Sequence, residues 1–159
     1  FLMLEKELDF VKELVGFAGA AALKGEGESA PVPEDVARGV AASAVERIVD
    51  AYPAERQRQI RVQLADSLRA VVAQRLLPRR DGQGRVAACE VLRNTHAVSG
   101  LIREGRTAQI AHALQTGGEA GMVPLARSLA GRVHAGLVAR EVAAEHTDDA
   151  ASLHQYLRR

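Results

Sequence analysis

The chain has 159 residues and a mass of 17.0 kDa, which fits one domain or one domain with a small appendage. Its 21 basic and 20 acidic side chains leave a formal charge of +1, which argues against a dedicated nucleic-acid-binding protein. A single cysteine, Cys89, excludes a disulfide framework and a cysteine-rich zinc module. Hydrophobic residues make up 47% of the chain, and no apolar run approaches the length of a bilayer span. We therefore expect a helix-rich cytoplasmic domain.

The first 33 residues differ in composition from the rest of the chain. All the lysines and phenylalanines lie in residues 1–24, and every later basic residue apart from histidine is arginine. Apolar side chains recur at helical spacing from residue 3, which predicts an amphipathic helix over residues 3–23. Residues 25–33 are rich in Gly, Glu and Pro without periodicity, which is typical of a linker. The expected organisation is therefore a distinct helix at 1–24, a linker at 25–33 and a main domain at 34–159.

The main domain begins with two helices and a β-hairpin. Pro33 fits the first turn of a helix that ends before Pro53, since the residue before a proline avoids helical geometry. The apolar spacing then predicts a longer helix to about Arg75. Residues 76–92 predict a hairpin that turns at Asp81-Gly82.

Short helices follow the predicted hairpin, each delimited by a capping residue, a proline or a glycine. The expected boundaries are Asn94 or Thr95 to Gly105, Thr107 to Gly117, Pro124 to His134 with Gly136 closing, one turn through Val142, and a last helix capped by Thr147 or Asp148.

Motifs for catalysis or cofactor binding are missing from the printed sequence. No segment matches the phosphate-binding pattern G-x-x-x-x-G-K-[ST], and the five histidines are scattered without metal-ligand spacing. Cys89 follows two alanines in a predicted strand, which favours a buried structural thiol over a nucleophile. We therefore expect no catalytic, cofactor-binding or metal-binding residues.

Five segments nevertheless carry a family resemblance. Residues 44–53 (AVERIVDAYP), 61–79, 84–90, 101–106 and 115–122 resemble, in order, the C-terminal part of PilT-type retraction ATPases of type IV pili, which drive twitching motility. The resemblance implies a mainly α fold: a helical C-terminal subdomain with one β-hairpin, derived from a RecA-like α/β ATPase domain. The nucleotide-binding core of that domain has no counterpart in this sequence.

Two features of the resemblance favour the retraction branch of this superfamily. Assembly and secretion relatives usually carry a four-cysteine zinc element, whereas this chain has one cysteine. Retraction ATPases also carry the motif Ala-Ile-Arg-Asn-Leu-Ile-Arg-Glu. Its second half stands here as Leu101, Ile102, Arg103 and Glu104, which the resemblance implies are interaction residues, while the preceding Arg-Asn is replaced by Ser99-Gly100.

The resemblance therefore implies the C-terminal domain of a pilus retraction ATPase that acts through protein contacts. The expected partners are further copies of the chain or pilus motor subunits, with no nucleic acid, no cofactor and at most a peripheral association with a membrane. Two alternatives stay open: a portion of an active hexameric ATPase whose catalytic core is supplied elsewhere, and an orphan regulatory or interaction module. Whether the chain belongs to an active enzyme also stays open, although alone we expect it to be inactive because hydrolysis needs a phosphate loop and a base.

Overall fold

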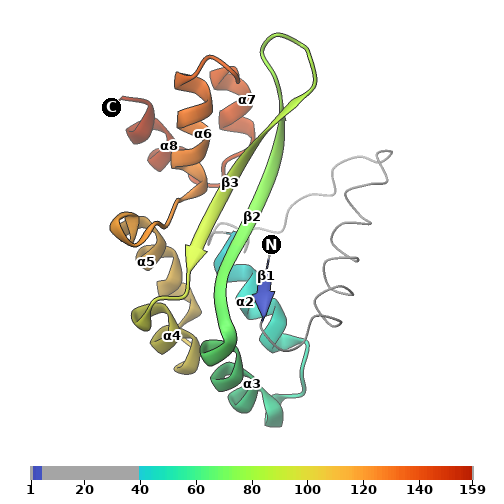
Figure 1. Ribbon diagram of the computed structural model, residues 1–159, viewed down its shortest axis with the longest axis vertical. Helices are drawn as coiled ribbons and strands as arrows, with labels where there is room; N and C mark the ends of the chain where they lie inside the picture. Colours follow the sequence, from blue (N-terminus) through green and yellow to red (C-terminus); the bar gives the residue numbers. More distant parts are fainter. Residues whose placement is uncertain (1, 5–39, 159) are drawn as a thin grey trace.

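The computed structural model of the protein describes residues 2–4 and 40–158 (Figure 1). The elements in chain order, with η for a 3-10 helix, are β1 (Leu2–Leu4), α2 (Val40–Asp50), α3 (Ala54–Ser67), β2 (Leu68–Pro78), β3 (Arg85–Arg93), α4 (His96–Arg103), η2 (Thr107–Gln109), α5 (Ile110–Thr116), η3 (Gly118–Ala120), α6 (Leu125–His134), α7 (Arg140–Glu145) and α8 (Ala150–Leu157). The expected class, mainly α with one β-hairpin, is confirmed. Within the described residues, no helix is long and apolar enough to cross a membrane.

The hairpin β2–β3 runs along the long axis of the molecule (Figure 1). The two strands pair antiparallel from Ala70↔Arg93 to Pro78↔Arg85, and they turn at the predicted Asp81-Gly82. Gly82 and Gly84 adopt φ values of 73° and 79°, a left-handed region that glycine reaches without steric cost. Local turn chemistry therefore fixes the closed end of the hairpin.

The predicted helix from Pro53 to Arg75 is wrong in its second half. α3 ends at Ser67, Leu68 is extended (φ −61°, ψ 133°), and residues 68–75 belong to β2. The apolar residues of this segment fit a helical period, but Val71 and Val72 also favour a strand. Residues 70–78 pair with β3 along their whole length, so tertiary context decides the conformation.

The predicted N-terminal helix is also wrong where it can be compared. Residues 3 and 4 belong to β1, which pairs antiparallel with β2 through Leu2↔Val71 and Leu4↔Leu68. The edge of β2 offers backbone donors and acceptors that a short strand can use. The remainder of that helix and the linker at 25–33 lie outside the described residues.

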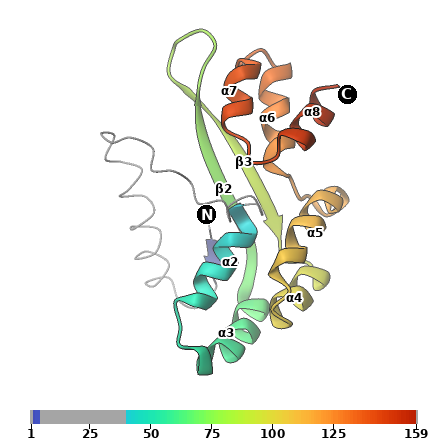
Figure 2. The same cartoon turned by 180° about the vertical axis from the view of Figure 1, so that it is seen from behind.

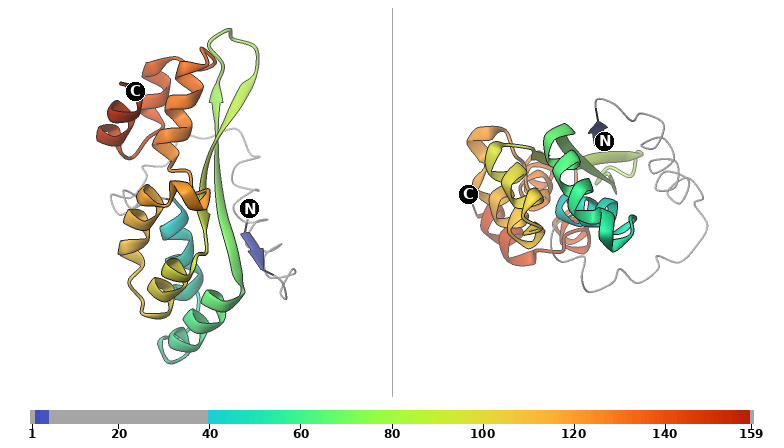
Figure 3. Two further views of the ribbon diagram at one scale, coloured as in Figure 1. Left: turned by 60° about the vertical axis from the view of Figure 1, so that its left-hand side comes forward. Right: turned by 90° about the horizontal axis from the view of Figure 1, so that it is seen from below.

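Two hydrophobic clusters lie along the hairpin. The proximal cluster, at the open end of the hairpin, joins α2–α5 to the strand ends: Ala41, Ala42, Val45, Ile48, Val49, Leu64, Ala65, Leu68, Val71, Leu92, Val98, Ile102, Ile110, Leu114 and Met122. The distal cluster, toward the turn, joins α6–α8 to the middle of the hairpin: Leu77, Ala88, Leu125, Ala126, Leu129, Ala130, Val138, Ala143 and Leu153. Figures 2 and 3 show the two groups of helices one above the other along the strands, with β1 beside β2 on the opposite side. We refer to these parts as the proximal half and the distal half.

Several predicted helix ends are confirmed and two are wrong. The Thr95 side chain caps α4 by accepting from the Val98 N–H, and Pro124 directly precedes α6. Thr107 caps no helix, because its hydroxyl bonds the Glu46 carboxylate instead. The last helix is capped by Asp149, whose Oδ1 accepts from the Ser152 N–H at 2.9 Å, rather than by Thr147 or Asp148.

The outer edge of β3 is covered by the segment that leads into α6 and by α6 itself. Val91 exchanges two backbone hydrogen bonds of 2.9 Å with Val123. Farther along the edge, the Cys89 N–H donates to Ser128 Oγ at 3.0 Å, and Arg132 Nε donates to the Ala87 carbonyl at 2.8 Å. Side chains of a helix thus replace a neighbouring strand and protect an edge that could otherwise pair with another chain. Cys89 itself is half-buried, so it is less enclosed than the sequence predicted.

Candidate interaction site on helices α3 and α4

The four motif residues occupy the C-terminal end of α4. Ile102 is fully buried in the proximal cluster, one helical turn after the buried Val98, whereas Leu101 is half-buried at the edge of that cluster. The helix register that follows the Thr95 cap gives the inward position to Ile102. Ile102 therefore serves the core, and the accessible part of the motif consists of the exposed Arg103 and Glu104 with the edge of Leu101.

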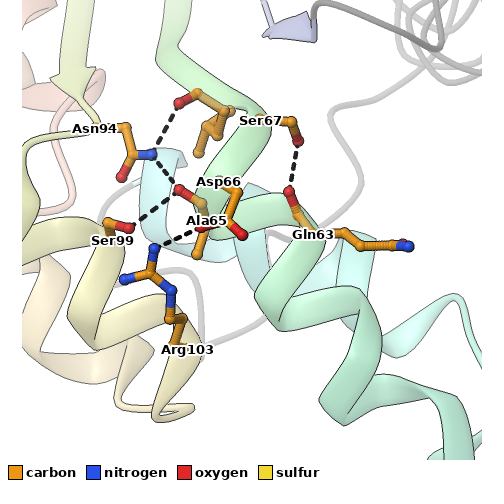
Figure 4. A network of polar contacts seen from close by, with 8 residues as sticks. Gln63, Ala65, Asp66, Ser67, Asn94, Ser99 and Arg103 are labelled. Carbon is orange, nitrogen blue, oxygen red and sulfur yellow. Dashed lines mark hydrogen bonds and ion pairs between the residues drawn. The ribbon is translucent and has the colours of Figure 1, made fainter.

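An ion pair joins the exposed part of the motif to α3. Arg103 Nη2 lies 2.5 Å from Asp66 Oδ1, with the two side chains 40% and 59% exposed (Figure 4). Glu104 pairs with Arg106 at 3.2 Å, also in solvent. Ion pairs this exposed contribute about 0–1 kcal/mol each to stability, so the fold does not require them. They leave a charged surface whose geometry is set by the contact of α3 with α4.

Polar side chains beneath this surface fix the end of α3. Asn94 Nδ2 donates to the carbonyls of Ala65 and Leu68, both at 2.8 Å, and Ser99 Oγ donates to the Ala65 carbonyl at 3.1 Å (Figure 4). The last carbonyls of a helix have no partner within the helix, so these donors satisfy acceptors that α3 leaves open. Ser99, which stands where the resembling family has Arg, thus holds α3 against α4.

Sequence reasoning missed the role of Asn94, which it considered only as a cap for α4. Within the described part of the chain, Asn94 Oδ1 is the one buried side-chain oxygen or nitrogen without a hydrogen-bond partner. The available signal was an amide side chain directly after a predicted strand, and it could not indicate which distant carbonyls the amide would reach.

Two carboxylates elsewhere have perturbed pKa values. Burial raises the pKa of Glu90 above its ordinary value, against the opposing effect of backbone donors from Ala41 and Leu125. At the hairpin turn, hydrogen bonds from the Arg79 guanidinium and the Gln83 N–H lower the pKa of Asp81 to about 2. Asp81 lies at the exposed turn of the hairpin, whereas Glu90 lines a cavity together with Asp148.

The described residues offer no cluster of three or more His, Cys, Asp or Glu side chains that could hold a metal ion. A cavity of about 80 Å³ lies between the two halves, and its lining includes Glu90, Leu114, Asp148, Ser152 and Tyr156. The cavity lining contains no phosphate-binding loop and no lysine that could pair with a phosphate, so the cavity does not resemble a nucleotide site.

Comparison with known proteins identifies relatives over the C-terminal part of the chain. The chain is 43% identical over 113 residues to a twitching motility protein of Neisseria gonorrhoeae, covering 71% of this chain and 30% of the relative. It is 45% identical over 105 residues to the type IV pilus retraction ATPase PilT of Pseudomonas aeruginosa, covering 66% of this chain and 30% of the relative. No protein-family model matches the chain.

Solved structures agree with these relatives. The crystal structure of the pilus retraction motor PilT with bound ADP aligns with a TM-score of 0.63 at 33% identity, over 72% of this chain and 32% of that chain. The ATPase DotB of Legionella pneumophila aligns with a TM-score of 0.54 at 21% identity, over 66% of this chain and 28% of that chain, and supports the fold alone. The chain spans about 30% of the length of the curated relatives it matches.

Proposed function

We propose that this chain, whose C-terminal part is homologous to PilT-type pilus retraction ATPases, works as the C-terminal body of such a motor through protein contacts. In this proposal the chain neither binds nor hydrolyses nucleotide alone, and it acts in the cytoplasm at the pilus machinery. The contact surface consists of Arg103 and Glu104 of α4, the edge of Leu101, and Asp66 of α3.

The observation that carries the proposal is the difference in burial between the residues of the motif. Its buried member, Ile102, has a clear structural task, but Arg103 and Glu104 are exposed and form ion pairs that the fold does not need. Surface pairs of this kind are usually replaceable without loss of stability. Arginine is also enriched at protein interfaces, where its guanidinium binds carboxylates in a fixed geometry. A partner that presents carboxylates to Arg103 fits this surface.

A portion of an active ATPase whose catalytic core is supplied elsewhere is the second candidate. It is favoured by one observation: the solved neighbour PilT carries ADP, and this chain aligns with only 32% of it. The two candidates differ in what the isolated chain does. The first needs only a protein partner, whereas the second needs nucleotide chemistry to appear when the missing core is added.

The experiment that tests the proposal uses Arg103→Ala, with Arg79→Ala as the matched control. Both arginines form exposed ion pairs, but Arg79 lies at the hairpin turn, at the other end of the molecule (Figure 1). We expect Arg103→Ala to weaken capture of the chain by immobilised Pseudomonas aeruginosa PilT, or its self-association in sedimentation velocity. The urea midpoint should stay within about 0.5 kcal/mol of the parent.

Arg79→Ala should bind like the parent chain. Equal binding by the parent and by both variants would contradict the contact surface, as would unfolding of Arg103→Ala. Loss of binding in both variants would indicate a general charge effect rather than a site.

A further inference from the structure

Glu90 is the only charged side chain in the described part of the chain that is almost completely buried, at 4% exposure. It lies on β3 between Leu92, which belongs to the proximal cluster, and Ala88, which belongs to the distal cluster. These three residues share the face of the strand that meets the helices, since side chains alternate along β3. Glu90 therefore occupies the place where the apolar packing of the two halves is interrupted.

The Glu90 carboxylate lies at the start of a helix from each half. Oε1 accepts from the Ala41 N–H at 2.8 Å, in the first turn of α2, and Leu125, the first residue of α6, lines the same cavity as Glu90. The first amides of a helix lack internal partners and carry its partial positive charge, so an anion is favourable there. One anionic side chain thus lies beside two helix starts whose helices belong to different hydrophobic clusters.

Other polar contacts also lie at the junction. Val91 and Val123 exchange their backbone hydrogen bonds, and Arg75 of β2 pairs with Asp148 at 2.8 Å, with both side chains partly exposed. The cavity of about 80 Å³ lies directly beside Glu90, so close apolar packing does not replace the carboxylate here. The charged groups that face Glu90 are Arg75, which favours its ionised form, and Asp148, which opposes it.

We propose that Glu90 is a clamp that couples the two halves and holds them as one rigid unit along the hairpin. With one carboxylate held by the first turn of α2 and placed beside the start of α6, α2 and α6 keep a fixed relative position. Without the carboxylate, the two helix starts have no common partner, and each half retains its own hydrophobic cluster. The halves can then move or unfold separately about the middle of β2 and β3.

The two tyrosines of the chain allow a direct test, because Tyr52 follows α2 in the proximal half and Tyr156 lies on α8 in the distal half, with no tryptophan present. Full-length chains with Tyr52→Phe or Tyr156→Phe report urea unfolding of one half each by tyrosine fluorescence. In the parent background we expect coincident midpoints. In the Glu90→Ala background we expect two separate midpoints, with the distal half unfolding first because its cluster is smaller.

The control is Asp148→Asn, which removes the partly exposed ion pair at the same junction and should leave the midpoints coincident. The proposal is overturned if Glu90→Ala lowers both midpoints by the same amount, or if Asp148→Asn separates them as strongly. Should Glu90→Ala fail to fold, Glu90→Gln decides the question. Its amide keeps one acceptor oxygen but not the charge, so a partial separation supports the clamp and coincident midpoints reject it.

Discussion

The proximal and distal halves both pack helices against the hairpin, but their hydrophobic clusters differ in composition. In the proximal half, large side chains such as Ile48, Leu64 and Ile102 fill the cluster, and Asn94 and Ser99 bond the end of α3 beneath it. The distal cluster depends more on alanine, with Ala88, Ala126, Ala130 and Ala143 among its members. Because burial of apolar area drives folding, the proximal half has more stabilisation to lose.

The difference shows where each half can support a function. The proximal half fixes α3 against α4 and thereby places Arg103 and Asp66 on a firm base. The distal half covers the edge of β3 with side chains of α6, which protects the hairpin, and its hydrophobic cluster has fewer large side chains. The contact surface that we propose therefore lies on the half with the larger hydrophobic cluster.

The largest effect should come from opening a cavity in either cluster. Ile102 and Leu129 are both fully buried, in the proximal and the distal cluster respectively. Truncation to alanine removes buried methyl groups and leaves a void, which should cost about 2–5 kcal/mol in each case. Urea unfolding of Ile102→Ala and Leu129→Ala measures the loss. A markedly smaller loss for Ile102→Ala than for Leu129→Ala would contradict the view that the proximal half has more stabilisation to lose.

An intermediate effect is expected from Asn94→Ala. The substitution removes both hydrogen bonds to the end of α3, so the Leu68 carbonyl loses the Asn94 donor and the Ala65 carbonyl keeps only Ser99 Oγ. We expect a loss of about 1–3 kcal/mol in urea unfolding, the typical cost of unpaired buried polar groups. Ser67→Ala is the control, since its hydroxyl makes only a local, exposed bond to the Gln63 carbonyl. Equal losses in both variants would show that the end of α3 does not depend on Asn94.

A small gain is expected at Gly100, which lies inside α4. A Cβ built at this position meets no atom within 4 Å, so alanine fits without displacing a neighbour. Gly100→Ala should raise the free energy of unfolding by about 0.5–1 kcal/mol, because glycine is unfavourable within a helix. Gly105→Ala should act in the opposite direction, since Gly105 has a φ of 69°. A thermal scan shows whether each variant is more or less stable than the parent chain. A destabilised Gly100→Ala would contradict the geometry of α4.

The smallest effect on the fold should come from the turn of the hairpin. Hydrogen bonds from Arg79 and the Gln83 N–H lower the pKa of Asp81 to about 2, from 3.8. Because the folded pKa is lowered, the contribution of this contact is present above pH 3.8 and is lost as the pH falls through about 2. An NMR titration of the Asp81 carboxyl should show this midpoint, and Arg79→Ala should move it toward 3.8. An unchanged midpoint in that variant would show that Arg79 is not the main cause of the lowered pKa of Asp81.

Local chemistry made part of this architecture predictable from the sequence. The turn at Asp81-Gly82, the Thr95 cap and the helix after Pro124 each depend on a few neighbouring residues, and all three are confirmed. The boundary between α3 and β2 was not predictable, because it depends on pairing with β3 and on Asn94, which lies 26 residues after Leu68.

The candidate site was predictable only in outline. Leu101 and Ile102 are equally apolar neighbours, and which of them faces the core depends on a helix register that tertiary packing fixes. Glu90 carried no sequence signal beyond an acidic residue in a strand, since its hydrogen-bond donor is the backbone amide of Ala41, which lies 49 residues away in the sequence. A hydrogen bond from a backbone amide does not depend on the side chain of the donor residue, so it leaves no pattern in the sequence.

The most direct test of the account is titration calorimetry of the chain with Mg-ATP. The proposed role depends on protein contacts, and the printed sequence holds no phosphate loop. We therefore predict no saturable heat of binding. Saturable binding in the low-micromolar range would contradict the account, because it would place a nucleotide site within this chain.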